Sequence, residues 1–172
     1  MWSESWIRKS ITVSIIAASL LVSTALGQEL VFTTPASQQV TLSSMQGKVA
    51  VMFFSGTQDP QCRDEFKALN NLAERYAGKP VAFYWVAINP VTAVSNDRLK
   101  APCGPVGSVV VLRDPTQAAF KRFSKNQSQI PTVVVLDQKG ATHGEPFAGF
   151  NPDSDFVNTL AGIVDSLLAQ QK

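Results

Sequence analysis

Two residues of this chain can carry thiol chemistry, and they are its only cysteines, Cys62 and Cys103. A thiolate can attack a disulfide, and a second thiol can then resolve the mixed disulfide that forms. Cys62 lies in FFSGTQDPQCRDEF, residues 53–66, between an apolar run and an amphipathic segment. Cys103 lies in KAPCGPVG, residues 100–107, whose prolines and glycines indicate an exposed loop. The first question is therefore whether the two sulfurs act together.

Three interpretations of the two cysteines stay open at the level of sequence. In an oxidising compartment two cysteines often pair. A Cys62–Cys103 bridge would close a loop of about 40 residues, for which the chain-entropy estimate of the stabilisation is ~4 kcal/mol. Such a bridge is either structural or redox-active, with Cys103 on a mobile loop in the second case. The third interpretation is two separate thiols.

Asp59 precedes Cys62 by three residues and is followed by Pro60. An Asp that accepts hydrogen bonds from the first amides, with a proline after it, is a typical helix start. The same Asp-Pro pair at 114–115 opens a second predicted helix, so we interpret Asp59 as a cap rather than as an acid or base. A helix N-terminus lowers a thiol's pKa, whereas burial and a nearby carboxylate raise it. We therefore expect Cys62 to be a comparatively unreactive thiol.

The elements around these residues follow from the spacing of apolar side chains. Continuous apolar runs predict strands, and apolar residues three and four apart predict helices. The predicted strands are residues 49–55, 81–89, 108–114, 130–137 and roughly 141–147, with a further short strand and turn at 40–48. The predicted helices begin at 59–60, at 114–115 and at 153–155. This pattern indicates an α/β sandwich, a central mixed sheet of about five strands with helices on both faces.

The N-terminus predicts export. Arg8 and Lys9 precede an apolar run from Ile11 to Leu26, with small residues at 25 and 27 where a signal peptidase would read them. We expect residues 1–27 to be a cleaved signal peptide and residues 28–172 to form one domain in the periplasm or outside the cell, with no stable membrane span. An uncleaved segment would instead anchor the chain in a membrane. The net charge of +2 is interspersed and gives no basic stripe for nucleic acid.

Four stretches together carry a family resemblance. They are GKVAVMFF (47–54), DPQCR (59–63), IPTVVVLDQKG (130–140) and FAGF (147–150) with a predicted helix after it. In this order they resemble the thioredoxin-like superfamily, and within it the exported TlpA/ResA-like, redoxin-related branch of thiol–disulfide oxidoreductases. The second stretch stands where that branch has Cys-Pro-Pro-Cys-Arg. The resemblance covers roughly residues 38–170 and implies a thioredoxin-like sandwich.

The chain departs from that branch at its reactive centre. Asp59 replaces the first cysteine, and Gln58 replaces the aromatic residue before it. Phe53 occupies the strand position where relatives often carry a buried polar or acidic group. Cys62 then corresponds to the resolving thiol and not to the attacking one. The resemblance thus implies a degenerate site that lacks the exposed nucleophile, its neighbouring platform and a proton-transfer partner.

The resemblance also implies a substrate-docking edge at Pro131, which is expected to be cis. In relatives the backbone beside this proline faces the cysteines and pairs with an extended substrate, a role that Ile130 and Thr132 would take here. A rigid turn is the alternative. No cofactor is implied. His143, the only histidine, has no spacing to other ligands that predicts a metal site.

Two functions follow as alternatives. The first is a divergent thiol–disulfide oxidoreductase of cell-envelope redox homeostasis, with Cys62 as its single active-site cysteine and Cys103 as a candidate partner. Its substrates would be thiols or disulfides of exported proteins or peptides, with weak or absent dithiol turnover. The second is a non-catalytic thioredoxin-fold module that binds an exported partner. Thr57 and Cys62 do not have the spacing of a peroxidase-like thiol enzyme.

Overall fold

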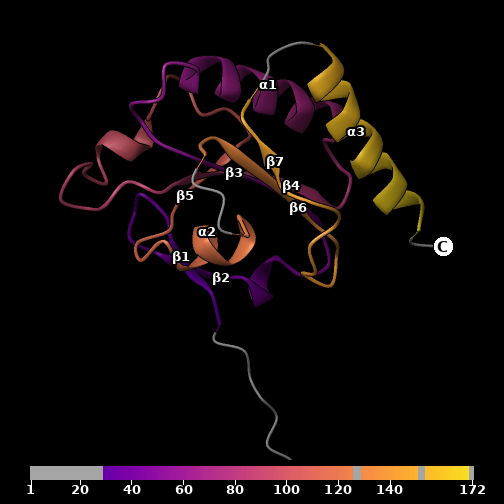
Figure 1. The fold of residues 1–172 in the computed structure, drawn as a ribbon, viewed down its shortest axis with the longest axis horizontal. Helices are drawn as coiled ribbons and strands as arrows, with labels where there is room; N and C mark the ends of the chain where they lie inside the picture. The colour runs from indigo at the N-terminus through magenta and orange to yellow at the C-terminus, as the bar shows by residue number, and fades with distance from the viewer. Residues whose placement is uncertain (1–28, 126–128, 151–153, 171–172) are drawn as a thin grey trace, which may run out of the picture.

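The computed structural model describes residues 29–125, 129–150 and 154–170. A seven-stranded sheet runs through these residues in the order β2-β1-β5-β4-β3-β6-β7 (Figure 1). The strands are β1 (Val31–Thr33), β2 (Gln39–Thr41), β3 (Val49–Ser55), β4 (Val81–Ala87), β5 (Val110–Arg113), β6 (Thr132–Leu136) and β7 (Phe147–Ala148). The helices are α1 (Cys62–Arg75), α2 (Ala118–Phe123) and α3 (Ser154–Ala169), with short 3-10 turns η1 (Ser43–Met45) and η2 (Arg98–Lys100).

The sheet is mixed, as predicted, and helices cover both of its faces. Strands β3, β4 and β5 run parallel, whereas β6 is antiparallel to β3 and β1 is antiparallel to β5. Helices α1 and α3 lie over one face and α2 lies over the other (Figure 1). This arrangement is the thioredoxin-like sandwich that the sequence predicts.

Strand β3 lies in the centre of the sheet and divides its side chains between two cores. Val51 and Phe53 belong to the core under α1 and α3, whereas Met52 and Phe54 belong to the core under α2. This alternation follows from the period of two along a strand. All seven residues of β3 are buried, so the strand is a rigid base for the loop that follows it.

The prediction of about five strands is too low, because the sheet has seven. Of the edge strands, β2 overlaps the short strand predicted at 40–48, whereas β1, which pairs with it, was not predicted. With only three residues, β1 is too short to show the alternation on which the prediction rests. The strand predicted at 141–147 is also reduced: β7 has two residues, and Thr142 forms only an isolated bridge to Leu136.

Helices α1 and α2 begin later than the Asp-Pro pairs suggest. Helix α1 begins at Cys62 and α2 at Ala118. Both aspartates nevertheless accept hydrogen bonds from amides at these starts: Asp59 Oδ1 from the Gln61 amide at 2.9 Å and Asp114 Oδ2 from the Phe120 amide at 2.7 Å. Asp59 bonds an amide that precedes the helix, and the N-cap of α1 is Gln61, which makes no side-chain capping hydrogen bond. The prediction that Asp59 caps α1 is therefore wrong, because the helix begins three residues later than the Asp-Pro pair suggests.

The predicted signal peptide, residues 1–27, lies outside the described residues. Within the described part of the chain, no helix combines the length and apolar character needed to cross a bilayer.

Candidate active site

Cys62 and Cys103 are bonded to each other in a disulfide. Their Cα atoms are 5.7 Å apart, although 41 residues separate them in sequence. Cys62 is the first residue of α1 and is only 3% exposed, whereas Cys103, in the β4–β5 connection, is half-buried. The structure therefore removes one of the three interpretations, that of two separate thiols. The site holds two sulfurs rather than a single active-site cysteine.

The loop between β3 and α1 places Cys62 through a series of backbone turns. The Asp59 amide donates to Gly56 O at 3.0 Å, and the Cys62 amide donates to Asp59 O at 3.1 Å. From the neighbouring β4–β5 connection, the Asn89 side chain accepts a hydrogen bond from the Thr57 amide at 3.0 Å. Cys62 thus sits at the N-terminus of a helix that begins directly beyond the central strand.

A buried arginine holds the beginning of the segment that carries Cys103. Arg113, at the end of β5, is 1% exposed, and its guanidinium donates to Asn89 O at 2.8 Å and to Val94 O at 2.5 Å. Because Asn89 also holds Thr57, the same residue connects this segment to the loop before Cys62. Leu99, four residues before Cys103, is fully buried.

Helix α1 holds the other end of the same segment. Asn70 Oδ1 accepts a hydrogen bond from the Ser108 amide at 3.2 Å. Gly107 has a positive φ of 60°, and a Cβ there would collide with the Asn70 side chain. The segment from 89 to 108 is therefore fastened at both ends by contacts that do not depend on the disulfide.

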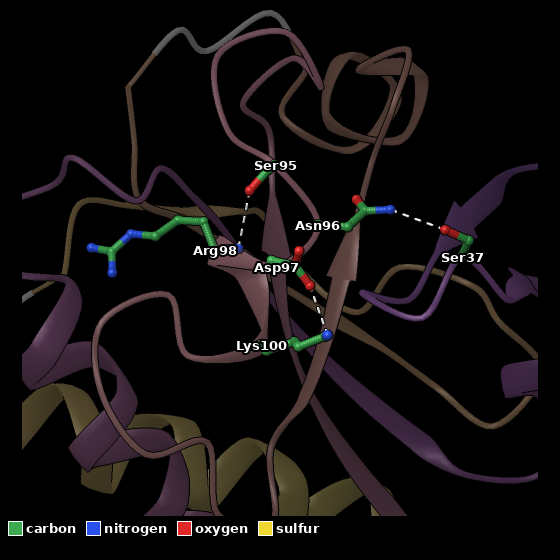
Figure 2. Close-up of polar contacts among 6 residues, drawn as sticks. All are labelled: Ser37, Ser95, Asn96, Asp97, Arg98 and Lys100. Carbon is green, nitrogen blue, oxygen red and sulfur yellow. Dashed lines mark hydrogen bonds and ion pairs between the residues drawn. The ribbon is translucent and has the colours of Figure 1, made fainter.

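The η2 turn between these anchors is also tied to the rest of the fold (Figure 2). Asn96 donates from its side-chain amide to Ser37 Oγ at 3.0 Å, which joins the turn to the β1–β2 connection. Lys100 pairs with Asp97 at 2.7 Å. The Arg98 side chain extends away from both contacts (Figure 2).

An acid that the sequence analysis missed lies beside Cys62 in the helix. Glu65 is fully buried; it accepts hydrogen bonds from Trp85 Nε1 at 3.1 Å and from Ser55 Oγ at 3.3 Å. Burial raises the pKa of this carboxyl to about 7; the two hydrogen bonds oppose the shift, and the charge of Asp59 adds to it. The expectation that Phe53 leaves the site without a buried acid is therefore wrong. The available signal was the spacing of three from Cys62, which places both on one side of α1.

An open groove lies beside the disulfide, with a volume of about 580 Å³. Residues between 57 and 64 form one wall, and Arg98 with residues 101–104 forms the other. Both cysteines line it, together with Asp59. We call this space the disulfide groove. It gives a ligand access to the bond from the side of the Cys103 segment.

The predicted docking residues lie beside the same loop but outside the disulfide groove. The Ile130–Pro131 peptide bond is cis. Ile130 is 39% exposed, and a Cβ at Gly56 would lie 3.8 Å from its Cδ1 atom. Thr132 is fully buried and donates to Gln129 O at 2.6 Å, while Pro131 O accepts from the Gly149 amide at 2.8 Å. Of the three, Ile130 is the one whose side chain is exposed to a partner.

The described residues contain no group of three or more His, Cys, Asp or Glu side chains that could hold a metal ion. His143 is exposed, and its amide donates to Val135 O at 2.8 Å.

Several solved structures have the same fold. A Chlorobium tepidum protein described as the thiol:disulfide interchange protein DsbE is 20% identical, with a TM-score of 0.67 over 81% of this chain and 93% of its own. MTB DsbF is 22% identical, with a TM-score of 0.61 over 80% and 93%. The exposed lipoprotein thioredoxin Etrx1 of Streptococcus pneumoniae is 17% identical, with a TM-score of 0.62 over 78% and 98%.

A comparison with curated proteins gave no match. The sequence model of one family, described as Redoxin, matches residues 23–145. That range is most of the chain, and it spans both cysteines, the buried Glu65 and the cis-proline at 131. The chain therefore belongs to the Redoxin family.

Proposed function

We propose that this protein is an exported thiol–disulfide oxidoreductase whose redox centre is the Cys62–Cys103 pair. The observation that carries the proposal is the position of the disulfide: it joins the N-terminus of the helix after the central strand to the wall of an open groove. Helix N-termini stabilise thiolates. Asp59 stands where related proteins have their first cysteine, so the second sulfur of the pair comes instead from Cys103 on a distant loop.

The exposure of the two cysteines determines which sulfur an incoming thiol attacks first. Cys103 is half-buried and borders the disulfide groove, whereas Cys62 is 3% exposed. An incoming thiolate attacks Cys103 Sγ and forms a mixed disulfide there, and the electron pair of the broken bond leaves on Cys62 Sγ. Cys62 is the leaving group because Cys103 is the more accessible sulfur; the helix N-terminus favours the Cys62 thiolate, whereas burial and Asp59 oppose it. In the reverse direction Cys62 resolves the mixed disulfide on Cys103.

Glu65 can hold the proton that this exchange moves. Its carboxyl lies three residues beyond Cys62 on the same side of α1, and its pKa of about 7 leaves both protonation states populated near neutral pH. A proton held there can pass to the Cys62 thiolate after the bond opens. In relatives a buried polar or acidic group often stands at a strand position that Phe53 fills here.

Export and protein substrates belong to the same proposal. The N-terminal pattern up to residue 27 predicts a signal peptide, and one structural neighbour is described as an exposed lipoprotein. Others are described as a thiol:disulfide interchange protein and DsbF. We infer that exported protein thiols or disulfides are the substrates, with Ile130 at the docking edge, and that the role is redox homeostasis of the cell envelope.

A second function has one observation in its favour. Cys62 is almost inaccessible, and the Asp59 carboxylate is engaged by the Gln61 amide in the turn before α1. Such a site suits a thioredoxin-fold binding module in which the disulfide only fastens the 89–108 segment.

The deciding experiment equilibrates the folded protein with mixtures of reduced and oxidised dithiothreitol and counts the free thiols by alkylation and mass spectrometry. An oxidoreductase pair opens in the folded state, and the wild type then reduces a disulfide-bonded test peptide. Cys103→Ser should abolish turnover, whereas Cys62→Ser should trap the test peptide on Cys103. A bond that opens only under denaturing conditions would rule out the redox function and leave the binding module as the remaining function.

A further inference from the structure

Charged side chains line both walls of the disulfide groove. Arg63 and Asp64 come from α1, Asp59 comes from the loop before it, and Arg98 comes from η2. Arg63, Asp64 and Arg98 are exposed. Among the ion pairs within the described residues, none engages either arginine. Arg63 and Arg98 thus line the same groove as the disulfide, and neither forms an ion pair within the described residues.

Arg98 is the residue of the η2 turn that lines the disulfide groove. Its neighbours are committed elsewhere, with Asn96 bonded to Ser37 and Lys100 paired with Asp97 (Figure 2). The Arg98 side chain extends in the opposite direction (Figure 2), and the residue is part of the groove lining. Leu99, fully buried beside it, fixes the turn from which the guanidinium extends.

We propose that the disulfide groove binds the reductant of this disulfide, a low-molecular-weight thiol that carries carboxylate and ammonium groups, and that Arg63 and Arg98 bind its carboxylates. This inference rests on the proposed function. Guanidinium groups favour carboxylates because their planar donors match the two oxygens. The two aspartates of the lining supply a partner for an ammonium group. The groove, at about 580 Å³, has the size of a small-molecule site.

The exchange balances with two molecules of the thiol. The first thiolate attacks Cys103 Sγ, a mixed disulfide forms on Cys103, and Cys62 leaves as a thiolate that takes up a proton. The second thiolate attacks the small-thiol sulfur of the mixed disulfide. The bond to Cys103 breaks, and Cys103 is released as a thiolate that also takes up a proton. Two thiols are thereby oxidised to one small disulfide, and the protein disulfide is reduced to two thiols.

The groove also separates the reductant from the protein substrate. Ile130, the exposed residue of the docking edge, is not among the residues that line the groove. A small thiol can therefore enter on the Cys103 side while the docking edge contacts a larger partner.

The test uses one thiol with and without its carboxylates: reduced glutathione and its diethyl ester, compared at equal thiolate concentration. The second-order rate constant for opening the disulfide is measured by acid quench, alkylation and mass spectrometry. Because exposed ion pairs are weak, we expect glutathione to open the wild-type disulfide about threefold to tenfold faster than the ester. Arg98→Ala and Arg63→Ala should each slow glutathione about threefold and leave the ester unchanged.

The matched controls are Lys100→Ala, which removes a cation from the same turn, and Lys67→Ala, which removes an exposed cation from α1. Both should keep the wild-type preference. Far-UV circular dichroism checks that each variant is folded. Equal rates for glutathione and its ester, or equal losses in the lysine variants, would overturn this inference while the opening itself still supports the proposed function. Failure of every thiol to open the folded protein's disulfide would refute the proposed function as well.

Discussion

At the scale of single residues, the buried acid Glu65 gives the site its pH dependence. Its carboxyl is surrounded by Trp85, Ser55 and apolar side chains, so ionisation is costly in the folded state. The pKa is raised from 4.5 to about 7. A carboxyl whose pKa is raised in the folded state contributes its full stability below pH 4.5, where it is protonated in both the folded and the unfolded state. This contribution is lost as the pH rises through about 7.

Replacing this acid should therefore flatten the pH dependence of stability. Glu65→Gln keeps an acceptor for Trp85 and a polar partner for Ser55 but cannot ionise. Relative to wild type, its free energy of unfolding should rise between pH 4.5 and pH 8, by up to about 3 kcal/mol. Urea unfolding at pH 4.5, 6 and 8 measures the difference. Glu74→Gln, an exposed position of the same helix, is the control. A constant difference across this range would show that the buried acid does not titrate there.

Asp59 combines a structural contact with an electrostatic effect on Cys62. Its carboxylate accepts from the Gln61 amide and lies at the helix end where a thiolate would form. Asp59→Asn keeps the acceptor and removes the charge, so we expect the pKa of the Cys62 thiol to fall, measured by the pH dependence of alkylation in a Cys103→Ser background. Asp155→Asn, which removes an exposed charge from the first turn of α3, is the control. An unchanged alkylation profile would leave Asp59 with its hydrogen bond to the Gln61 amide as its only role.

At the scale of elements, the 89–108 segment determines how close the sulfurs stay after reduction. Asn70 on α1 and Arg113 on β5 hold its two ends. With the ends fixed, reduced Cys103 remains near Cys62, and a high effective concentration favours re-formation of the bond.

Removing one anchor should make the disulfide easier to reduce. Asn70→Ala loses the bond to the Ser108 amide, a contact of about 1 kcal/mol, so the equilibrium constant for reduction should rise about fivefold. The dithiothreitol equilibrium described above measures it. Asn71→Ala, an exposed neighbour on the same helix, should leave the constant unchanged. Equal constants in all three proteins would show that Asn70 does not position the segment.

The sequence predicts the central elements and misses those that depend on distant partners. Strand β3 and its neighbour β4 are continuous apolar runs, and their burial on both faces produces that pattern. Strand β1, with three residues, is too short for any periodic signal. Glu65 is a single charged residue at a position whose spacing along the helix is that of buried apolar residues. Periodicity alone does not predict a role for such a residue. The pairing of Cys62 with Cys103 depends on the path of a 41-residue connection, which local spacing does not encode.

At the scale of the whole molecule, two cores stabilise the fold on either side of the sheet. Cys62 belongs to the core under α1 and α3, and Cys103 packs against that core, but both cores consist mainly of apolar side chains from the sheet and the helices. We therefore expect the reduced protein to remain folded.

Loss of the covalent bond should still lower stability measurably. Cys103→Ser should reduce the free energy of unfolding by about 2–4 kcal/mol relative to the oxidised protein, because the unfolded chain is no longer constrained. Denaturant unfolding of oxidised wild type, reduced wild type and the variant measures this, and the last two should agree. Unfolding of the reduced protein in the absence of denaturant would mean that the bond is structural.

The distance of 41 residues between the cysteines has a further consequence. Two cysteines separated by two residues meet even in an unfolded chain, whereas these two are brought together by the sheet and α1. Folding and oxidation thus form one thermodynamic cycle, in which the free energy by which the bond stabilises the fold equals the free energy by which the fold makes the bond harder to reduce. A newly synthesised chain therefore forms this bond most favourably once its tertiary structure is in place, so the state of its sulfurs reports whether it has folded.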